Sequence, residues 1–407
     1  MAEQAYKYVI VGGGRAAASA VDGIREVDGD GSILVIGNEM ELPYNRPPLT
    51  KDLWFGKKTV EKTFIHPQEY YTEQNAVLRR GPNVVSLDPT AKVVKDETGE
   101  SFRYEKLLLA TGGRPRHLTL PGSELDGICY YRYFSDYHRI REMAQPDSTA
   151  VVVGGGFIGS EIAAALNHNR VKVTMIYPEP YLVARVFPEG LGRHLQKMYQ
   201  ERGIGIFHDN APTAFERQDG KFITRTRTGD DLVSDILIIG AGIYPNVELA
   251  ESAGLRVENG IVVDEYLRSS DPQIYAAGDN ANFPYEALGT HMRIEHWDNA
   301  MSQGKAAGRN MAGAEEPFTY MPYFFSDLFE FGYEAVGEVN SRLETFEDWE
   351  KEFDTGAIYY VKEHKVRGVM LCNIWGKLDR ARELIRGGHQ VVPEQIRGLI
   401  NSGKEAA

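Results

Sequence analysis

Cysteine is almost absent from this chain, whose 407 residues include only Cys129 and Cys372. The two are far apart in the sequence and form neither a C-x-x-C nor a C-x4-C pair. This pattern predicts two reduced thiols and argues against a disulfide framework. No cluster of residues predicts a metal site.

Long apolar runs and an excess of positive charge are also absent. No apolar run approaches the ~20 residues of a membrane-spanning helix, and the first residues resemble neither a signal nor a transit peptide. The net charge of -13 and the pI of about 5.4 argue against nucleic acid or an anionic membrane as the main partner. We therefore expect a cytoplasmic protein, which at this length contains two or three domains.

What the sequence does contain is a glycine turn between a strand and a helix, near the start of the chain. Its spacing is G-x-G-x-x-A, with Gly12, Gly14 and Ala17 at the defining positions. Gly12 permits the tight turn, Gly14 lets a pyrophosphate approach the backbone, and Ala17 lets the helix pack closely on the strand. The helix, expected over residues 16–25, adds free N–H groups and a positive dipole end for the phosphates.

An acidic residue is expected after the next strand, residues 32–36, to bind the ribose hydroxyls of the dinucleotide. Asn38 and Glu39 occupy this place, and we predict that Glu39 has the role. The alternative is a solvated acidic residue in a loop.

The same pattern occurs a second time, after a run of valines. Gly154, Gly156 and Gly159 form a full G-x-G-x-x-G motif before a helix expected over residues 160–169. A strand follows and ends near Glu179, close to the ~20-residue spacing expected for the ribose-binding acid. Two such motifs predict two bound dinucleotides and an internal duplication.

Three buried strands end in turns of small residues, at 107–113, 236–242 and 274–279. Such turns let the backbone pass close to a ligand. The third ends in a carboxylate that can accept hydrogen bonds from a sugar-alcohol chain and from helix N–H groups. The residues predicted to contact cofactor at these turns are Thr111, Gly112, Gly242, Gly278 and Asp279.

The loop at residues 41–51 contains three prolines and two cations, Arg46 and Lys51. A rigid cationic loop beside a nucleotide site suits a phosphate and an electron-rich ring. A structural turn with solvated charges is an equally good interpretation from the residues alone.

The character of the chain changes near residue 317. An aromatic segment at 320–331 precedes strand-like runs at 334–339, 357–361 and 366–374, and a helix is expected at about 378–386. This pattern predicts a smaller α+β domain. Four cations make the helix locally basic, either as a solvated face or as a docking surface for an acidic carrier; they are Lys377, Arg380, Arg382 and Arg386.

Taken together, these stretches resemble the two-dinucleotide flavoprotein oxidoreductases of the glutathione-reductase fold. Within that fold the chain is similar to apoptosis-inducing factor and to the ferredoxin reductases of oxygenase systems. The resemblance implies an α/β protein with two Rossmann-like domains and a C-terminal α+β domain. Its expected boundaries are 1–119 with 243–316 for FAD, 120–242 for NAD and 317–407 for the last domain. The segments that carry the resemblance are 42–55, 245–250, 293–296 and 332–337.

The resemblance also implies roles for particular residues on the FAD side. It places Arg46 and Lys51 on FAD, with Lys51 near the flavin N5 and paired with Glu161. It places Asp279 on the ribityl chain. Glu295 and His296 would lie beside the nicotinamide and flavin rings. Lys51 and Glu161 are therefore the predicted catalytic residues.

On the NADH side, the resemblance places Phe157 where it gates the nicotinamide face and Glu179 on the adenosine ribose. Arg185 falls at a further NADH contact. Trp297 and Phe325 would order the stacked rings and exclude water.

Three positions depart from the family pattern. Asn38 stands where an acidic residue is usual, and Phe325 replaces a tryptophan of a Trp-Ser-Asp pattern. Trp297 replaces the second histidine of apoptosis-inducing factor and is more like the ferredoxin reductases.

We expect an NADH-dependent FAD enzyme that passes electrons to a ferredoxin-like iron–sulfur carrier. Disulfide and peroxide chemistry are not expected, because no cysteine lies between residues 1 and 128. One alternative is slow NADH oxidation with quinone or oxygen as acceptor. Another is a redox sensor with a long-lived charge-transfer complex and redox-linked dimerisation. The protein would be a monomer or a homodimer.

Overall fold

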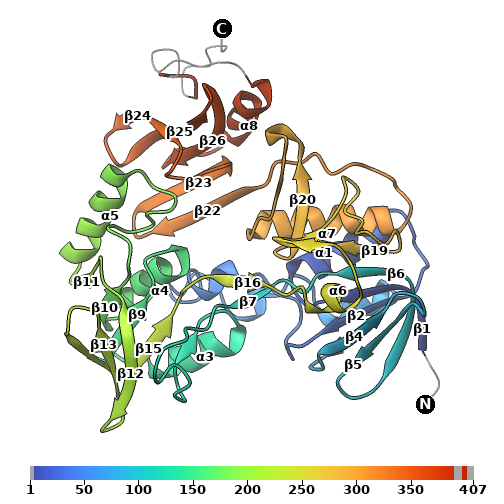
Figure 1. Ribbon diagram of the computed structural model, residues 1–407, viewed down its shortest axis with the longest axis horizontal. Coiled ribbons are helices and arrows are strands. Elements are labelled where there is room, and N and C mark those ends of the chain that lie inside the picture. Colours follow the sequence, from blue (N-terminus) through green and yellow to red (C-terminus); the bar gives the residue numbers. More distant parts are fainter. Residues whose placement is uncertain (1–3, 389–396, 401–407) are drawn as a thin grey trace. The chain divides into compact units, whose positions relative to one another are not determined.

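The computed structural model describes residues 4–388 and 397–400 (Figure 1). The chain divides into two compact units, and each combines three separate stretches of sequence. Unit 1 comprises Met1–Asn45, Thr59–Arg114 and Tyr244–Pro322, and unit 2 comprises Arg46–Lys58, Pro115–Ile243 and Tyr323–Ala407. Short strands β7 (Gly113–Pro115) and β16 (Ile243–Pro245), where the chain passes from one unit to the other, pair with each other. The three-domain boundaries given above stay a prediction, and residues 1–3, 389–396 and 401–407 lie outside the described residues.

Unit 1 is built on a sheet centred on β1 (Gln4–Val11), which pairs in parallel with its two neighbours. The last four residues of β1 and all of β2 are buried, which explains their continuous apolar runs: a parallel strand is covered on both faces. The order is β3-β2-β1-β6-β5-β4, and β19 pairs in parallel with the end of β6. The bounds are β2 Ile33–Gly37, β3 Ala76–Arg80, β4 Val84–Asp88, β5 Val93–Asp96, β6 Ser101–Leu109 and β19 Ile274–Ala276.

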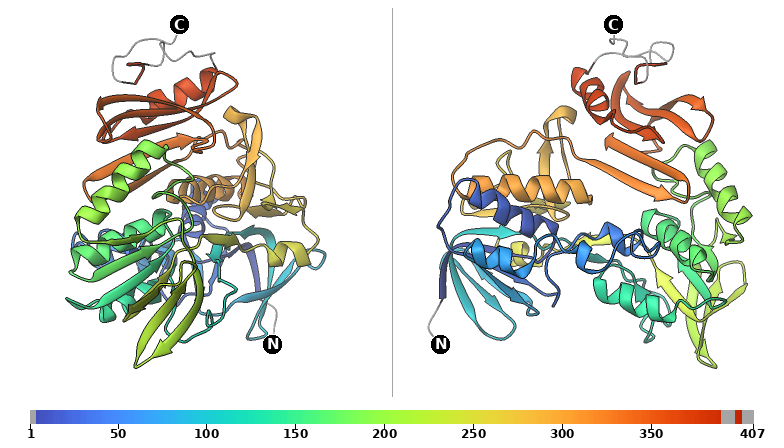
Figure 2. Two further views of the ribbon diagram at one scale, coloured as in Figure 1. Left: turned by 60° about the vertical axis from the view of Figure 1, so that its left-hand side comes forward. Right: turned by 180° about the vertical axis from the view of Figure 1, so that it is seen from behind.

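Two helices of unit 1, α1 (Arg15–Arg25) and α7 (Trp297–Met311), lie side by side (Figure 2). Their backbones approach closely because small residues face each other. A Cβ on Gly304 would lie 2.2 Å from the carbonyl oxygen of Ala16, and one on Gly308 would lie 2.2 Å from that of Ala20. The glycines of α7 therefore set the distance between the two helices. Unit 1 also contains α2 (Gln68–Glu73), α6 (Glu248–Ser252) and the sheet β17 (Val257–Glu258), β18 (Gly260–Val262), β20 (Ala281–Tyr285) and β21 (Thr290–Met292).

Unit 2 repeats the arrangement with the order β11-β10-β9-β15-β8. Its core lies between this sheet and a three-stranded antiparallel sheet, where Val151, Val153, Leu237 and Ile239 pack with Phe215. β13 and β14 pair as an antiparallel hairpin. The elements are β8 Cys129–Tyr130, α3 Phe134–Met143, β9 Thr149–Val153, α4 Phe157–His168, β10 Lys172–Ile176, α5 Glu189–Glu201, β11 Gly205–Phe207, β12 Pro212–Gln218, β13 Lys221–Thr226, β14 Asp231–Ser234 and β15 Ile236–Ile239.

The C-terminal part of unit 2 is an antiparallel sheet in the order β22-β23-β26-β25-β24, with α8 (Leu378–Gly387) packed on β23 and β26. Three of these strands and the helix were predicted. β22 and β24 were not. β24 has the sequence ETFEDWEK and lies at the edge of the sheet, where charged residues are tolerated and apolar alternation is weak. The bounds are β22 Tyr323–Leu328, β23 Phe331–Gly337, β24 Glu344–Lys351, β25 Thr355–Lys362 and β26 Lys365–Cys372.

One helix begins three residues earlier than predicted: α4 begins at Phe157 instead of Ser160. In α4 the residue before the helix, Gly156, is extended, so the helix starts as soon as the glycine turn ends. Among residues 4–388 and 397–400, no helix combines the length and apolar character needed to cross a membrane.

Candidate functional site: two glycine turns and a buried ion pair

The first glycine turn has the geometry of a dinucleotide cradle. Gly12 has φ +134°, its N–H donates to the carbonyl of Ile36 at 2.7 Å, and a Cβ there would lie 2.1 Å from the carbonyl oxygen of Ala110. Gly14 precedes α1, and a Cβ on it would meet nothing within 4 Å. Gly12 is therefore required by the fold itself, whereas Gly14 leaves the start of the helix open to a pyrophosphate.

Around this turn, polar groups gather at the ends of β6 and β19. The Thr111 hydroxyl donates to the carbonyl of Asn246 at 2.6 Å and accepts from the Asn280 amide at 2.8 Å. The Gly278 N–H donates to the Gln303 side chain at 2.9 Å. The amide oxygen of Asn280 is buried and has no hydrogen-bond partner among the described residues. Such an acceptor fits a cofactor hydroxyl, and simple sequence spacing did not identify Asn280.

Glu39 lies just beyond β2, as predicted, and is half-buried. Its carboxylate accepts a hydrogen bond of 2.6 Å from the Tyr44 hydroxyl. Asn38, beside it, is exposed. This placement is consistent with a ribose ligand, and that role stays a prediction.

Arg293 organises the segment that contains three further predicted residues. Its guanidinium donates to the backbone carbonyl of Asp279 at 2.8 Å and pairs with Glu295 at 2.6 Å. Loss of hydration lowers the pKa of His296 to about 4, although the charge of Asp279 acts in the opposite direction. His296 is therefore neutral at physiological pH.

Trp297 begins α7, and its indole N–H donates to Asn45 at 2.6 Å. The Arg15 guanidinium lies 5.0 Å from the centre of the indole ring. The Nε atom of Arg15 is buried and has no hydrogen-bond partner in the part of the chain that the structure describes. Arg15 occupies a variable position of the first glycine motif, so the motif gave no signal for it.

The second glycine turn repeats the first. Gly154 has φ +122°, and a Cβ there would lie 2.4 Å from the carbonyl oxygen of Gly240. A Cβ on Gly159 would lie 2.0 Å from the carbonyl oxygen of Gly154, whereas one on Gly156 would meet nothing within 4 Å. The second turn thus fits a dinucleotide by the same criterion as the first.

Glu179 follows β10, and its side chain is 27% exposed. The Arg185 guanidinium lies 3.4 Å from the Glu179 carboxylate but is 88% exposed. The carboxylate is therefore the better fixed of the two groups.

Lys51 and Glu161 form a buried ion pair within unit 2. The ammonium Nζ lies 3.2 Å from Glu161 Oε1 and 4.5 Å from the centre of the Phe325 ring. Asp327 is a more distant partner, at 4.0 Å, and its side chain is largely exposed. The structure thus brings together three predicted residues from a loop, from α4 and from β22.

Two residues of this cluster were missed. The Thr50 hydroxyl donates to Glu161 Oε2 and the Ser326 hydroxyl donates to Oε1, each at 2.5 Å. Both stand next to predicted residues in the sequence, and that adjacency was the only available signal.

Phe157 begins α4 and packs edge-on against Phe324, with ring centres 5.7 Å apart. Arg46 donates to the backbone carbonyl of Arg132 at 2.9 Å and lies over the Tyr133 ring. The predicted residues thus lie in two sets, one per unit. Unit 1 contains Gly12, Gly14, Ala17, Glu39, Thr111, Gly112, Gly278, Asp279, Glu295, His296 and Trp297, and unit 2 contains Arg46, Lys51, Gly154, Gly156, Phe157, Gly159, Glu161, Glu179, Arg185, Gly242 and Phe325.

Both cysteines are buried and free. Burial raises the pKa of the Cys129 thiol to about 12, and burial also raises that of Cys372 well above its usual value. Neither thiol is a nucleophile at neutral pH.

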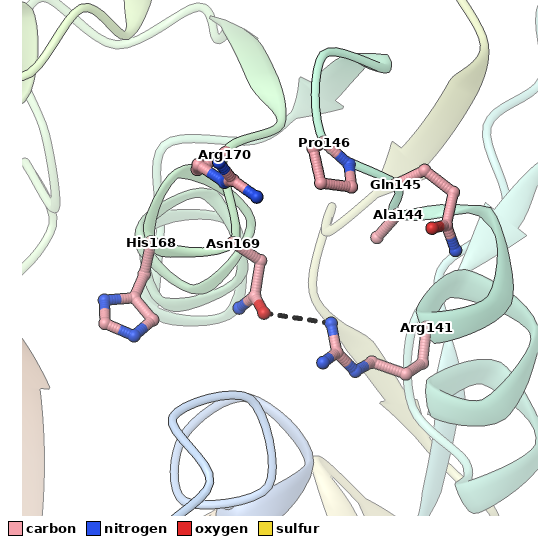
Figure 3. Close-up of a pocket in the computed structure, with 7 residues that line it drawn as sticks. All are labelled: Arg141, Ala144, Gln145, Pro146, His168, Asn169 and Arg170. Atoms are coloured by element: carbon pink, nitrogen blue, oxygen red, sulfur yellow. Dashed lines mark hydrogen bonds between the residues drawn. The ribbon is translucent and has the colours of Figure 1, made fainter.

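A hollow lies at the C-terminal ends of α3 and α4, the opposite end of α4 from its glycine turn (Figure 3). Arg141 crosses it and donates to the Asn169 side chain at 2.9 Å. Cations at helix C-termini complement the negative end of the helix dipole. We therefore assign Arg141 and Arg170 a favourable electrostatic contact with these helix ends.

The four cations at α8 do not form one continuous basic surface, and a docking role for them stays a prediction. The Arg382 side chain is only 11% exposed and pairs with Asp379 at 2.9 Å. Arg380 pairs with Glu383 at 3.2 Å. Lys377 and Arg386 are exposed, but Lys377 is the non-helical residue that precedes α8, whereas Arg386 lies in its last turn.

Two sheets, each with a central set of parallel strands and a glycine turn that opens onto a helix N-terminus, are the arrangement of a protein that binds two dinucleotides. The family described as pyridine nucleotide-disulphide oxidoreductase matches residues 6–304, and the chain belongs to this family. The family described as apoptosis-inducing factor, mitochondrion-associated, C-term, matches residues 307–351. The protein is an NADH-dependent flavoprotein oxidoreductase with FAD and NAD(H) as cofactors.

Several relatives cover most of the chain. It is 34% identical to apoptosis-inducing factor 1 of Dictyostelium discoideum, over 93% of this chain and 78% of that protein. It is 33% identical to the ferredoxin–NAD(+) reductase component of the anthranilate 1,2-dioxygenase system of Burkholderia cepacia, over 96% of each. Among solved structures, the covalent putidaredoxin reductase–putidaredoxin complex contains a chain with a TM-score of 0.90 and 29% identity, covering 98% of this chain and 96% of that one.

Proposed function

We propose that this protein accepts electrons from NADH and delivers them to a small ferredoxin-like iron–sulfur carrier. FAD, when bound, supplies the chemistry by accepting a hydride at N5 and releasing the electrons one at a time. Relatives named as ferredoxin and rubredoxin reductases support this acceptor class, as does the structural likeness to putidaredoxin reductase in its complex.

The observation that carries the proposal is the burial of both cysteines. Disulfide-reducing enzymes of this fold pass electrons through a reactive thiol. Cys129 and Cys372 are buried, and burial holds both thiols protonated. An electron route that needs no thiol is therefore favoured.

In this proposal, Lys51 provides a fixed positive charge near N5 that stabilises negative charge on the reduced ring. Glu161 holds the ammonium, and Phe157 and Phe325 would exclude water and order the rings. No side chain needs to donate or remove a proton during hydride transfer.

On the NADH side, Glu179 would accept hydrogen bonds from the adenosine ribose and repel a 2′-phosphate. Arg185 is a solvated cation beside it that would contact the cofactor without setting the preference. The preferred reductant is thus NADH.

A second function is favoured by one observation, the match of residues 307–351 to the C-terminal family of apoptosis-inducing factor. This match supports a redox sensor, in which NADH binding changes the oligomeric state and reoxidation is slow. Direct oxidation by quinone or oxygen is a third route.

Stopped-flow spectroscopy distinguishes these functions. The flavin is first reduced by NADH without oxygen and then mixed with an oxidised [2Fe–2S] ferredoxin, with a quinone or with air. Reoxidation that is fast only with ferredoxin supports the proposal. Reduced protein that persists for many minutes with all three acceptors contradicts it and supports the sensor, for which light scattering before and after reduction measures dimerisation. A colourless protein that takes up no FAD refutes all three functions.

A further inference from the structure

The Glu161 carboxylate is held by two hydroxyl groups in addition to Lys51. Thr50 donates to one carboxylate oxygen and Ser326 donates to the other. All three residues are buried, with exposed fractions of 4% for Thr50, 1% for Ser326 and 7% for Glu161. Both oxygens of the carboxylate are therefore occupied by donors from the protein.

The two hydroxyls come from separate parts of the unit. Thr50 follows the short 3-10 helix Pro47–Leu49 and directly precedes Lys51. Ser326 lies in β22, where its register partner on β23 is Tyr333. Because both oxygens accept hydrogen bonds from different segments, the Glu161 carboxylate cannot rotate freely about its terminal torsion.

A buried ion pair needs this kind of support. Removing two charges from water is unfavourable, and their mutual attraction compensates only if the remaining lone pairs are also hydrogen-bonded. The Lys51 ammonium has Glu161 as its near carboxylate, at 3.2 Å, and Asp327 only at 4.0 Å. The position of the ammonium therefore depends on the position of the Glu161 carboxylate.

We propose that Thr50 and Ser326 are positioning residues that orient Glu161 and, through it, fix the Lys51 ammonium. The functional consequence rests on the role proposed above for Lys51 beside the flavin. The positioning itself rests only on the hydrogen bonds and on burial.

The test uses Thr50→Val and Ser326→Ala, singly and together, in the FAD-loaded protein. Thr50→Ser retains the hydroxyl and serves as the conservative variant. Thr224→Val is the matched control, because Thr224 lies in β13 of the same unit and its buried hydroxyl has no hydrogen-bond partner within residues 4–388 and 397–400. It removes a buried hydroxyl without touching Glu161.

The first readout is the chemical reactivity of Lys51. Brief acetylation followed by mass spectrometry measures the fraction of each lysine that is modified. We expect Lys51 to react several-fold faster in the Thr50→Val/Ser326→Ala protein, and at the original rate in Thr50→Ser and Thr224→Val. The exposed Lys197 should react equally in all variants. Unchanged reactivity of Lys51 in the double variant overturns the proposal.

The second readout is flavin reduction by NADH, together with the flavin midpoint potential. Each single variant should slow reduction by about tenfold, the scale of a hydrogen bond to a charged group. The double variant should also lower the potential. In a Glu161→Gln background the same substitutions should have little further effect, because they act through that carboxylate. If the substitutions slow flavin reduction equally in the native and the Glu161→Gln backgrounds, they do not act through Glu161.

The two readouts separate this inference from the proposed function. If Lys51 reactivity rises but the reduction rate and the potential do not change, Thr50 and Ser326 position the ammonium and the proposed flavin role of Lys51 is wrong. If neither Lys51 reactivity nor reduction changes, the positioning inference itself is wrong.

Discussion

The ammonium of Lys51 and the carboxylate of Glu161 lie 3.2 Å apart and are both buried, although 110 positions separate them in the sequence. The loop that contains Lys51 and the helix that contains Glu161 thus meet at a charged contact, which Phe325 covers from β22. A buried pair of this kind makes each partner dependent on the other.

Lys51→Met and Glu161→Gln should each slow flavin reduction by NADH by at least about tenfold while FAD stays bound, since neither residue belongs to a glycine turn. The double variant should lose less than the product of the two single losses, because residues in contact are coupled. Stopped-flow rates measure this, and FAD fluorescence after denaturation checks cofactor content. Strictly multiplicative losses would show that the pair does not act as a unit.

NADH should be preferred to NADPH in kcat/KM. Glu179→Ser should narrow that preference by about tenfold or more, since it removes the carboxylate that repels a 2′-phosphate. Arg185→Gln is the control and should leave the preference in place, because its side chain is 88% exposed. A native preference for NADPH would refute the assignment of Glu179.

Substitutions of two glycines in the second turn should have different effects, one on stability and the other on NADH binding. Gly154→Ala should destabilise the protein, because its Cβ would lie 2.4 Å from a backbone carbonyl oxygen at φ +122°. Gly156→Ala has open space and an ordinary φ of -85°. It should keep the melting temperature but raise KM for NADH several-fold by obstructing the pyrophosphate. Equal melting temperatures with an unchanged KM for Gly156→Ala would place NADH elsewhere.

Because of Asp235, the stability of the protein should depend on pH in the acidic range. Hydrogen bonds from Lys221 and Thr149 lower its pKa to about 2, and the carboxylate, which lies between β14 and β15, thereby links β13 to β9. A carboxyl whose pKa is lowered by folding stabilises the protein fully above its unfolded pKa of about 3.9. That stabilisation is lost as pH falls toward 2.

Asp235→Asn should therefore lower the free energy of unfolding by about 1 kcal/mol at pH 7. The difference from the native protein should shrink between pH 4 and pH 3. Urea unfolding at several pH values measures it. If the difference in unfolding free energy between the native protein and Asp235→Asn stays the same from pH 4 to pH 3, the charge of Asp235 does not stabilise the fold.

Charge reversal at Arg382 and at Arg386 of α8 should affect stability differently. Arg382→Glu should destabilise the protein, because it places a negative charge at a largely buried position that also faces the Glu334 carboxyl. Arg386→Glu, at an exposed position, should leave stability unchanged within about 0.5 kcal/mol. If Arg386 nevertheless takes part in carrier docking, its reversal should slow ferredoxin reduction at low salt and leave NADH-dependent flavin reduction intact.

Much of the fold could be predicted because it depends on short-range patterns. The two glycine motifs, the buried strands and the helix of residues 378–386 all follow from residues within one or two turns of each other. β22 and β24 were missed because they are rich in aromatic or charged residues and do not show a clear alternation of apolar and polar residues. The early start of α4 was missed because its first residue, Phe157, is a weak helix former that is held by a tertiary contact.

The sequence by itself determined the two dinucleotide turns, because at Gly12 and Gly154 a φ of +134° or +122° and a carbonyl oxygen 2.1 or 2.4 Å from a Cβ exclude any side chain. It also determined that a thiol route is disfavoured, because the chain has only two cysteines. Only the tertiary structure decided which groups share the buried site of unit 2. Thr50 and Ser326 reach Glu161 because a loop, a helix and a strand converge there, and Arg382 is withdrawn from the surface by its packing on the C-terminal sheet. Such contacts between distant segments depend on side-chain packing, which no local pattern encodes.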